Sequence, residues 1–180
     1  MSSTQDDSSL AETYFHVPRR LVPYFCGREK ILRELAAVFN LLAESEGRQT
    51  PVIVLHAMGG QGKSQIALEF CRTSQERYHG VFWIDAASVD TVESAYQRMA
   101  LLIDPSSSSS MRSPEADIRI VVSKLAKWEK RWLLVFDNWD QPDACDIRRF
   151  IPNSKYPDGF GDKGLTASSG SRLGAGHQPA

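Results

Sequence analysis

Residues 55–64 read LHAMGGQGKS, and this glycine-rich stretch decides the fold. It matches the phosphate-binding pattern GxxxxGK[ST] at Gly62, Lys63 and Ser64, with Ala57 at the first glycine position, which is tolerated if its φ is negative. Glycines let successive backbone N–H groups curl around a phosphate, and a Cβ atom there would crowd it. Lys63 would reach the β- and γ-phosphates of a purine nucleotide, while the Ser64 hydroxyl would bind Mg²⁺. The predicted nucleotide-binding residues around this loop are Met58, Gly59, Gly60, Gln61, Gly62, Lys63, Ser64 and Gln65.

The flanking sequence predicts a parallel sheet covered by helices. Three apolar runs, at 51–55, 81–85 and 132–137, have the length and composition of buried strands. The other segments carry apolar residues at helical spacing, and we expect helices that begin near residues 28, 63, 88 and 113. Apolar strands that alternate with amphipathic helices are typical of a parallel sheet buried on both faces. We therefore predict a P-loop NTPase fold of the α/β class, a three-layer α/β/α arrangement with three clear core strands.

A second signal is the aspartate that ends the third apolar run. Residues 133–137 read LLVFD, which is the pattern of a Walker B strand, just as the glycine-rich loop is a Walker A motif. A carboxylate at this end of the strand lies beside the loop and can hold Mg²⁺, usually through water. We predict Asp137 as the catalytic, Mg²⁺-linked residue, and Ser64 and Asp137 as the metal ligands. Asp85 ends the second run, and we interpret it as a turn or helix-entry carboxylate; His56 we interpret as a packed histidine.

Composition and charge narrow the class of protein. A chain of 180 residues fits one domain, and its net charge of −1 gives no basic excess that would favour DNA or RNA as a partner. Cys26, Cys71 and Cys145 have no metal-ligand spacing, so we interpret them as buried or half-buried thiols. No signal peptide and no membrane-spanning run is recognisable, so we expect a cytoplasmic, soluble protein without a membrane partner.

Polar and glycine-rich stretches at both ends set the predicted domain boundaries. We expect a disordered tail at 1–20, a partial nucleotide-binding domain at 21–153, and a Gly/Ser-rich disordered tail at 154–180.

Together these motifs resemble the NB-ARC domain of the STAND class of P-loop NTPases, in the version found in fungal NLR-like proteins. The resemblance runs from about residue 24 to residue 151 and includes FCGRE at 25–29, which is similar to the family's motif over the adenine. It implies that Phe25, Cys26 and Arg28 contact the adenine or ribose. It also implies a molecular switch that binds ADP or ATP with Mg²⁺ and, after exchange of ADP for ATP, associates with itself or with NLR-like relatives.

The sequence departs from the family pattern in two ways that bear on catalysis. Many relatives carry a second acid after the Walker B aspartate, whereas this chain has Asn138, which is no useful base near neutral pH. After residue 152 no sensor strand or ARC helix is recognisable, so we expect a truncated or mis-spliced member with at most slow ATP hydrolysis. Two alternatives stay open: an active P-loop ATPase or small kinase, and a non-functional or purely interacting fragment of an NLR-like protein.

Overall fold

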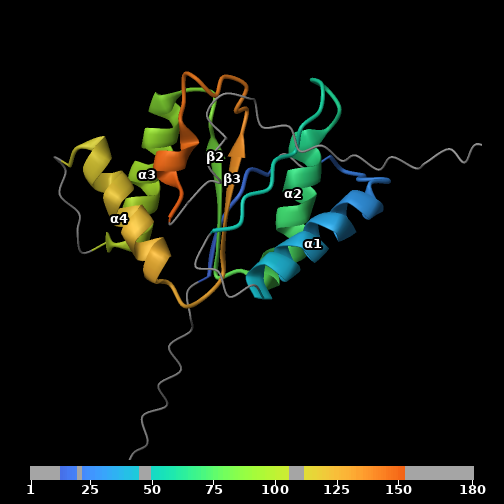
Figure 1. Cartoon of the computed structure of the whole chain (residues 1–180), viewed down its shortest axis with the longest axis horizontal. Helices are drawn as coiled ribbons and strands as arrows, with labels where there is room; N and C mark the ends of the chain where they lie inside the picture. Colours follow the sequence, from blue (N-terminus) through green and yellow to red (C-terminus); the bar gives the residue numbers. More distant parts are fainter. Residues whose placement is uncertain (1–12, 20–21, 45–49, 106–111, 153–180) are drawn as a thin grey trace, which may run out of the picture.

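The computed structural model describes residues 13–19, 22–44, 50–105 and 112–152, which form three layers (Figure 1). A parallel sheet of strand order β1-β2-β3 lies between helices α1 and α2 on one face and α3 and α4 on the other. The strands are β1 (Tyr14–His16), β2 (Gly80–Asp85) and β3 (Trp132–Asp137). The helices are α1 (Glu29–Glu44), α2 (Lys63–Ser74), α3 (Val89–Ile103) and α4 (Pro114–Lys127), with 3₁₀ turns η1 (Gln75–Arg77) and η3 (Ile147–Phe150). This arrangement confirms the predicted α/β class and layering.

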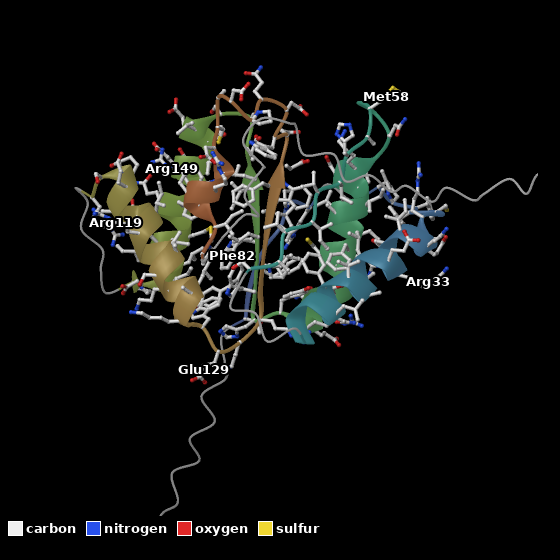
Figure 2. All side chains as sticks on the ribbon, viewed as in Figure 1. Arg33, Met58, Phe82, Arg119, Glu129 and Arg149 are labelled. Carbon is white, nitrogen blue, oxygen red and sulfur yellow. The ribbon has the colours of Figure 1, made fainter. Side chains whose placement is uncertain are left out.

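The central strand β2 is largely buried because it carries apolar side chains on both faces of the sheet. Val81 and Leu133 pack with residues of α1 and α2, whereas Phe82 and Ile84 pack with residues of α3 and α4. Figure 2 shows Phe82 near the middle of the molecule, beside the sheet. This division follows from the alternation of side chains along a strand.

Parallel pairing brings two aspartates to the same edge of the sheet. The register of β2 and β3 runs from Gly80 opposite Trp132 to Asp85 opposite Asp137. Both strands therefore end in a carboxylate at neighbouring positions. Parallel sheets place ligand sites at this edge.

The first of the predicted strands is absent from the sheet. Residues 51–55 have no regular secondary structure, and no strand in the described part of the chain pairs with them. Ile53 and Leu55 still pack with the α1–α2 side of the core, while Val52 is 38% exposed. The prediction was wrong because this apolar run buries side chains without joining the hydrogen-bonded ladder.

The sheet contains instead the strand β1, whose residues fall within the stretch 1–20 that the sequence predicts as a disordered tail. The Tyr14 N–H group donates a hydrogen bond of 2.8 Å to the His79 carbonyl, and β1 pairs in parallel with β2. The Tyr14 ring stacks on Phe82 and on Trp128, with ring centroids 6.2 Å and 5.8 Å away. This aromatic contact packs the Tyr14 side chain against the core and so holds the short strand β1 in the sheet. Residues 1–12 and 154–180 of the predicted tails lie outside the described residues.

Local signals set the helix starts. The Ser88 side chain caps α3 in a reciprocal capping box with Thr91. The Ser113 side chain accepts from the Ala116 N–H group at the start of α4, and Pro114 occupies the first turn, as the sequence predicts. Among the described residues, no helix is long and apolar enough to cross a membrane.

The three cysteines lie in different surroundings. Cys71 and Cys145 are buried as predicted, whereas Cys26 is exposed, so the prediction for Cys26 was wrong. Burial raises the pKa of the Cys71 thiol to about 12, and this thiol therefore stays protonated near neutral pH.

Candidate nucleotide-binding site

The glycine-rich loop joins the irregular segment 51–58 to the first residue of α2. Gly60 and Gly62 have φ values of 77° and 81°, in the left-handed region that glycine adopts without strain, and Gly62 is the N-cap of α2. Adjacent residues aside, no atom of the described residues lies within 4 Å of the position that a Cβ would take at Gly59, Gly60 or Gly62. Backbone conformation therefore requires glycine at 60 and 62, and the space beside the loop is open.

Three residues at the start of this loop differ in conformation and exposure. Ala57 is not among the residues with positive φ, so alanine carries no backbone strain at the template's first glycine position. Met58 is 75% exposed, and Figure 2 shows it at the tip of the loop beyond the N-terminal end of α2. His56 is exposed, which overturns its interpretation as a packed histidine.

The Lys63 side chain turns back onto its own loop. Its Nζ atom donates to the Ala57 carbonyl at 2.8 Å and to the Met58 carbonyl at 3.2 Å. The ammonium group thus ties the beginning of the loop to the start of α2. These two carbonyls hold the positive charge against the backbone of the loop.

The two predicted metal ligands lie in direct contact. The Ser64 hydroxyl on the first turn of α2 donates a hydrogen bond of 2.8 Å to Asp137 Oδ1 at the end of β3, 73 positions away in the sequence. A hydroxyl and a carboxylate oxygen are the hard ligands that Mg²⁺ takes, and Mg²⁺ needs only one or two protein ligands because it keeps several waters. Residues Ser64 and Asp137 therefore fit this ion. No cluster of three or more His, Cys, Asp or Glu side chains able to hold a metal occurs among the described residues.

A second set of hydrogen bonds joins the ends of β2 and β3. Asp85 Oδ1 accepts from the Ala87 N–H group at 3.2 Å and from Asn138 Nδ2 at 3.1 Å. The first contact supports the interpretation of Asp85 as a turn carboxylate. The second was missed by the sequence analysis, because only the register of β2 against β3 brings Asn138 to Asp85 and that register is not visible in the sequence.

The segment at 22–28 lies beside the start of α2. The Val22 N–H group donates a hydrogen bond of 3.1 Å to Gln65 Oε1, so Gln65 holds this segment. Phe25 is half-buried and packs with the α1–α2 side of the core, while Cys26 and Arg28 are exposed. The segment therefore runs close to the loop, with Arg28 in a left-handed conformation at φ 68°.

Comparison with protein families gives a match to the NB-ARC domain over residues 32–156, which is well over half of the chain. The chain belongs to the NB-ARC family. NB-ARC domains are nucleotide-binding signalling modules of the P-loop class, and this membership agrees with the sequence prediction. No curated protein and no solved structure matches the chain.

The NB-ARC match covers some of the predicted site residues and leaves out others. It includes the loop, Lys63, Ser64 and Asp137, which the structure brings together at one edge of the sheet. It begins after Phe25, Cys26 and Arg28, so their contact with adenine or ribose stays a prediction.

Proposed function

We propose that this NB-ARC chain binds ADP and ATP together with Mg²⁺ and acts as a cytoplasmic signalling switch with little or no hydrolysis of its own. The observation that carries the proposal is the 2.8 Å hydrogen bond between Ser64 Oγ and Asp137 Oδ1. It joins the Walker A hydroxyl to the Walker B carboxylate, the two groups that hold Mg²⁺ in P-loop NTPases. The phosphates and Mg²⁺ would then both lie at the edge of the sheet where β2 and β3 end.

The phosphates would lie against the glycine-rich loop and the N-terminus of α2. The first N–H groups of a helix have no partner within the helix, and the helix dipole favours an anion there. Lys63 would exchange its contacts with the Ala57 and Met58 carbonyls for the β- and γ-phosphate oxygens. The ammonium group has three donors, so one carbonyl contact can persist in the bound state.

Mg²⁺ would be held by the Ser64 hydroxyl directly and by Asp137 through water. Bound Mg²⁺ neutralises charge on the β- and γ-phosphates. To bind it, Ser64 turns a lone pair of its oxygen to the ion, and its proton can still be donated to the Asp137 carboxylate. The two side chains therefore need only small changes to accept the ion.

The base would lie near the segment at 22–28. The hydrogen bond from Val22 to Gln65 in the first turn of α2 supports this position of the base, because the phosphates would lie at the same end of the helix. Cys26 and Arg28 are exposed and accessible to a ligand, while Phe25 supports the segment from the core side. Mutation of Arg28 tests this position of the base separately from the phosphate contacts.

We expect slow ATP hydrolysis because of the residue that follows Asp137. Asn138 has no basic atom near neutral pH, and its side-chain amide donates to Asp85. An attacking water would therefore find no general base at this position. Signalling would depend on which nucleotide is bound and on association with a second copy or with NLR-like relatives.

Calorimetric titration of the purified chain with ADP and ATP tests the proposal. We expect binding in Mg²⁺ buffer, and weaker binding in EDTA. Ser64→Ala should remove most of the difference between the two buffers, whereas Glu129→Ala, at the opposite end of the molecule from the loop in Figure 2, should leave it unchanged. A folded wild-type protein that binds neither nucleotide would refute the proposal.

A further inference from the structure

The end of β3 is fixed to the end of β2 by one hydrogen bond at Asp137 and another at the residue that follows it. The Ala86 N–H group donates to the Asp137 carbonyl at 2.7 Å, and Asn138 Nδ2 donates to Asp85 Oδ1 at 3.1 Å. The same Asp85 oxygen accepts from the Ala87 N–H group at 3.2 Å. The backbone of Asp137 is therefore held both at its own carbonyl and through the next side chain.

Asn138 adopts a backbone conformation that few residues tolerate. Its φ is 61°, and asparagine is one of the residue types that visit the left-handed region readily. This conformation turns the chain sharply after Asp137, and the Asn138 carbonyl accepts from the Asp140 N–H group at 2.9 Å. The turn orients the Asn138 amide towards β2, where Asp85 accepts it.

We propose that Asp85 and Asn138 form a latch across the ends of β2 and β3 that positions the Asp137 carboxylate for Mg²⁺. Asn138 thus positions the Asp137 carboxylate, in addition to replacing the second acid that many relatives carry at this place in the sequence. The inference rests on the proposed function, because it concerns the same Mg²⁺-nucleotide site. With its backbone held at its own carbonyl and through Asn138, Asp137 meets Ser64 Oγ at 2.8 Å. Groups that orient a residue bound directly to a metal commonly change metal affinity by about 10- to 100-fold when they are removed, and because Asp137 would hold Mg²⁺ through water we expect the lower end of this range.

The latch needs an amide at position 138 and a hydrogen-bond acceptor at position 85. A carboxylate at 138 would have no proton to donate near neutral pH and would face the Asp85 carboxylate at hydrogen-bonding distance. Like charges this close repel, so Asn138→Asp should open the latch and should not supply a working base. An asparagine at 85 keeps an acceptor oxygen for both donors, so Asp85→Asn should preserve the latch.

The test measures how much Mg²⁺ improves ADP affinity in the full chain. Titrations in Mg²⁺ and in EDTA give a ratio of dissociation constants for the wild type, Asp85→Ala, Asp85→Asn, Asn138→Asp and Asn138→Gly. The glycine variant keeps the left-handed turn and removes only the side chain. Glu129→Ala is the control, since Figure 2 shows Glu129 at the end of the molecule opposite Met58 and the loop. Circular dichroism and thermal melting establish that each variant is folded.

We expect Asp85→Ala, Asn138→Asp and Asn138→Gly to lower the ratio about tenfold, with the EDTA affinity unchanged. Asp85→Asn and Glu129→Ala should keep the wild-type ratio. In the protein without nucleotide or metal, the same three variants should speed hydrogen exchange at the Ala86 amide, which donates to Asp137. A double variant, Asp85→Ala with Asn138→Gly, should lose no more than either single variant.

The outcomes separate the inference from the proposed function. If the wild type binds ADP more tightly in Mg²⁺ and the latch variants keep that gain, the latch is refuted and the proposed function stands. If Asp85→Asn loses the gain as fully as Asp85→Ala, the Asp85 charge acts on the ion itself and the latch is again refuted. If the folded wild type binds no nucleotide at all, the proposed function fails, whereas faster exchange at Ala86 in the variants would still support the latch.

Discussion

Replacement of Lys63 by alanine is the most direct test of the phosphate site. The side chain donates to the Ala57 and Met58 carbonyls at 2.8 Å and 3.2 Å, and these contacts show that Nζ reaches the inner side of the loop. In the nucleotide complex it would meet the β-phosphate through a charge-assisted hydrogen bond, worth about 1.5–3 kcal/mol. We therefore expect Lys63→Ala to weaken ADP and ATP binding by about ten- to a hundredfold, and so to abolish binding that is measurable by calorimetry at ordinary protein concentrations.

Lys63→Ala also removes the two carbonyl contacts, so the experiment has to separate loss of a phosphate contact from collapse of the loop. AMP makes this distinction, because it lacks the β-phosphate that Lys63 would contact. Its affinity should change much less than that of ADP if the loop keeps its shape, and should fall equally if the loop collapses.

Lys30→Ala is the matched control for Lys63→Ala. The Lys30 side chain is 84% exposed on α1 and pairs only loosely with Glu34, at 3.8 Å. It should leave the affinity for all three nucleotides unchanged. An unchanged ADP affinity in folded Lys63→Ala would show that the loop does not bind phosphate.

Three further predictions concern turnover and stability. Multiple-turnover assays should give ATP hydrolysis at or below about 10⁻³ s⁻¹, and steady turnover near 1 s⁻¹ that Asp137→Ala abolishes would overturn the proposed lack of a base. Tyr14→Ala should lower the free energy of unfolding in urea by about 1–3 kcal/mol, because it removes the stacking that holds β1, whereas Tyr14→Phe should lose much less; equal losses would mean that the ring contributes little. The hydrogen bond from Arg72 holds the pKa of Glu69 below its ordinary value of 4.5, so its stabilising effect is present above that value and is lost as pH falls through the lowered pKa. Glu69→Gln should therefore lower the melting temperature at pH 7 by up to about 3 °C and have less effect near pH 3; an equal effect at both pH values would contradict the charge argument.

The sequence was informative where a pattern has only one structural use. The run of apolar residues that ends in Asp137 predicted β3, and the pairing of a loop rich in glycine with a following helix predicted the start of α2 at Lys63. The cap at Ser113 also lies where its hydroxyl and the following proline predict it. In each case the chemistry of a few neighbouring residues decides the local structure.

The sequence failed where tertiary contacts decide between alternatives. Residues 51–55 have the composition of a buried strand, yet burial of Ile53 and Leu55 needs only packing, and nothing local determines whether a ladder partner is present. The strand β1 is three residues long, too short for a period to be visible, and it depends on Trp128 far along the chain. The hydrogen bond from Asn138 to Asp85 was likewise hidden, because only the register of β2 against β3 brings the two together.

The polar groups of the candidate site already bind one another in the structure. Lys63 binds two carbonyls of its own loop, Ser64 binds Asp137, and Gln65 accepts from Val22. A ligand therefore exchanges hydrogen bonds and does not simply add them, and the affinity that it gains from each is a difference between two partners. This exchange explains why removal of Lys63 should cost no more than about a hundredfold, although its charge would bind phosphate in the complex. It also explains why the latch matters, since Asp137 can stay beside Ser64 when Mg²⁺ binds if the hydrogen bonds from Ala86 and Asn138 hold its backbone in place.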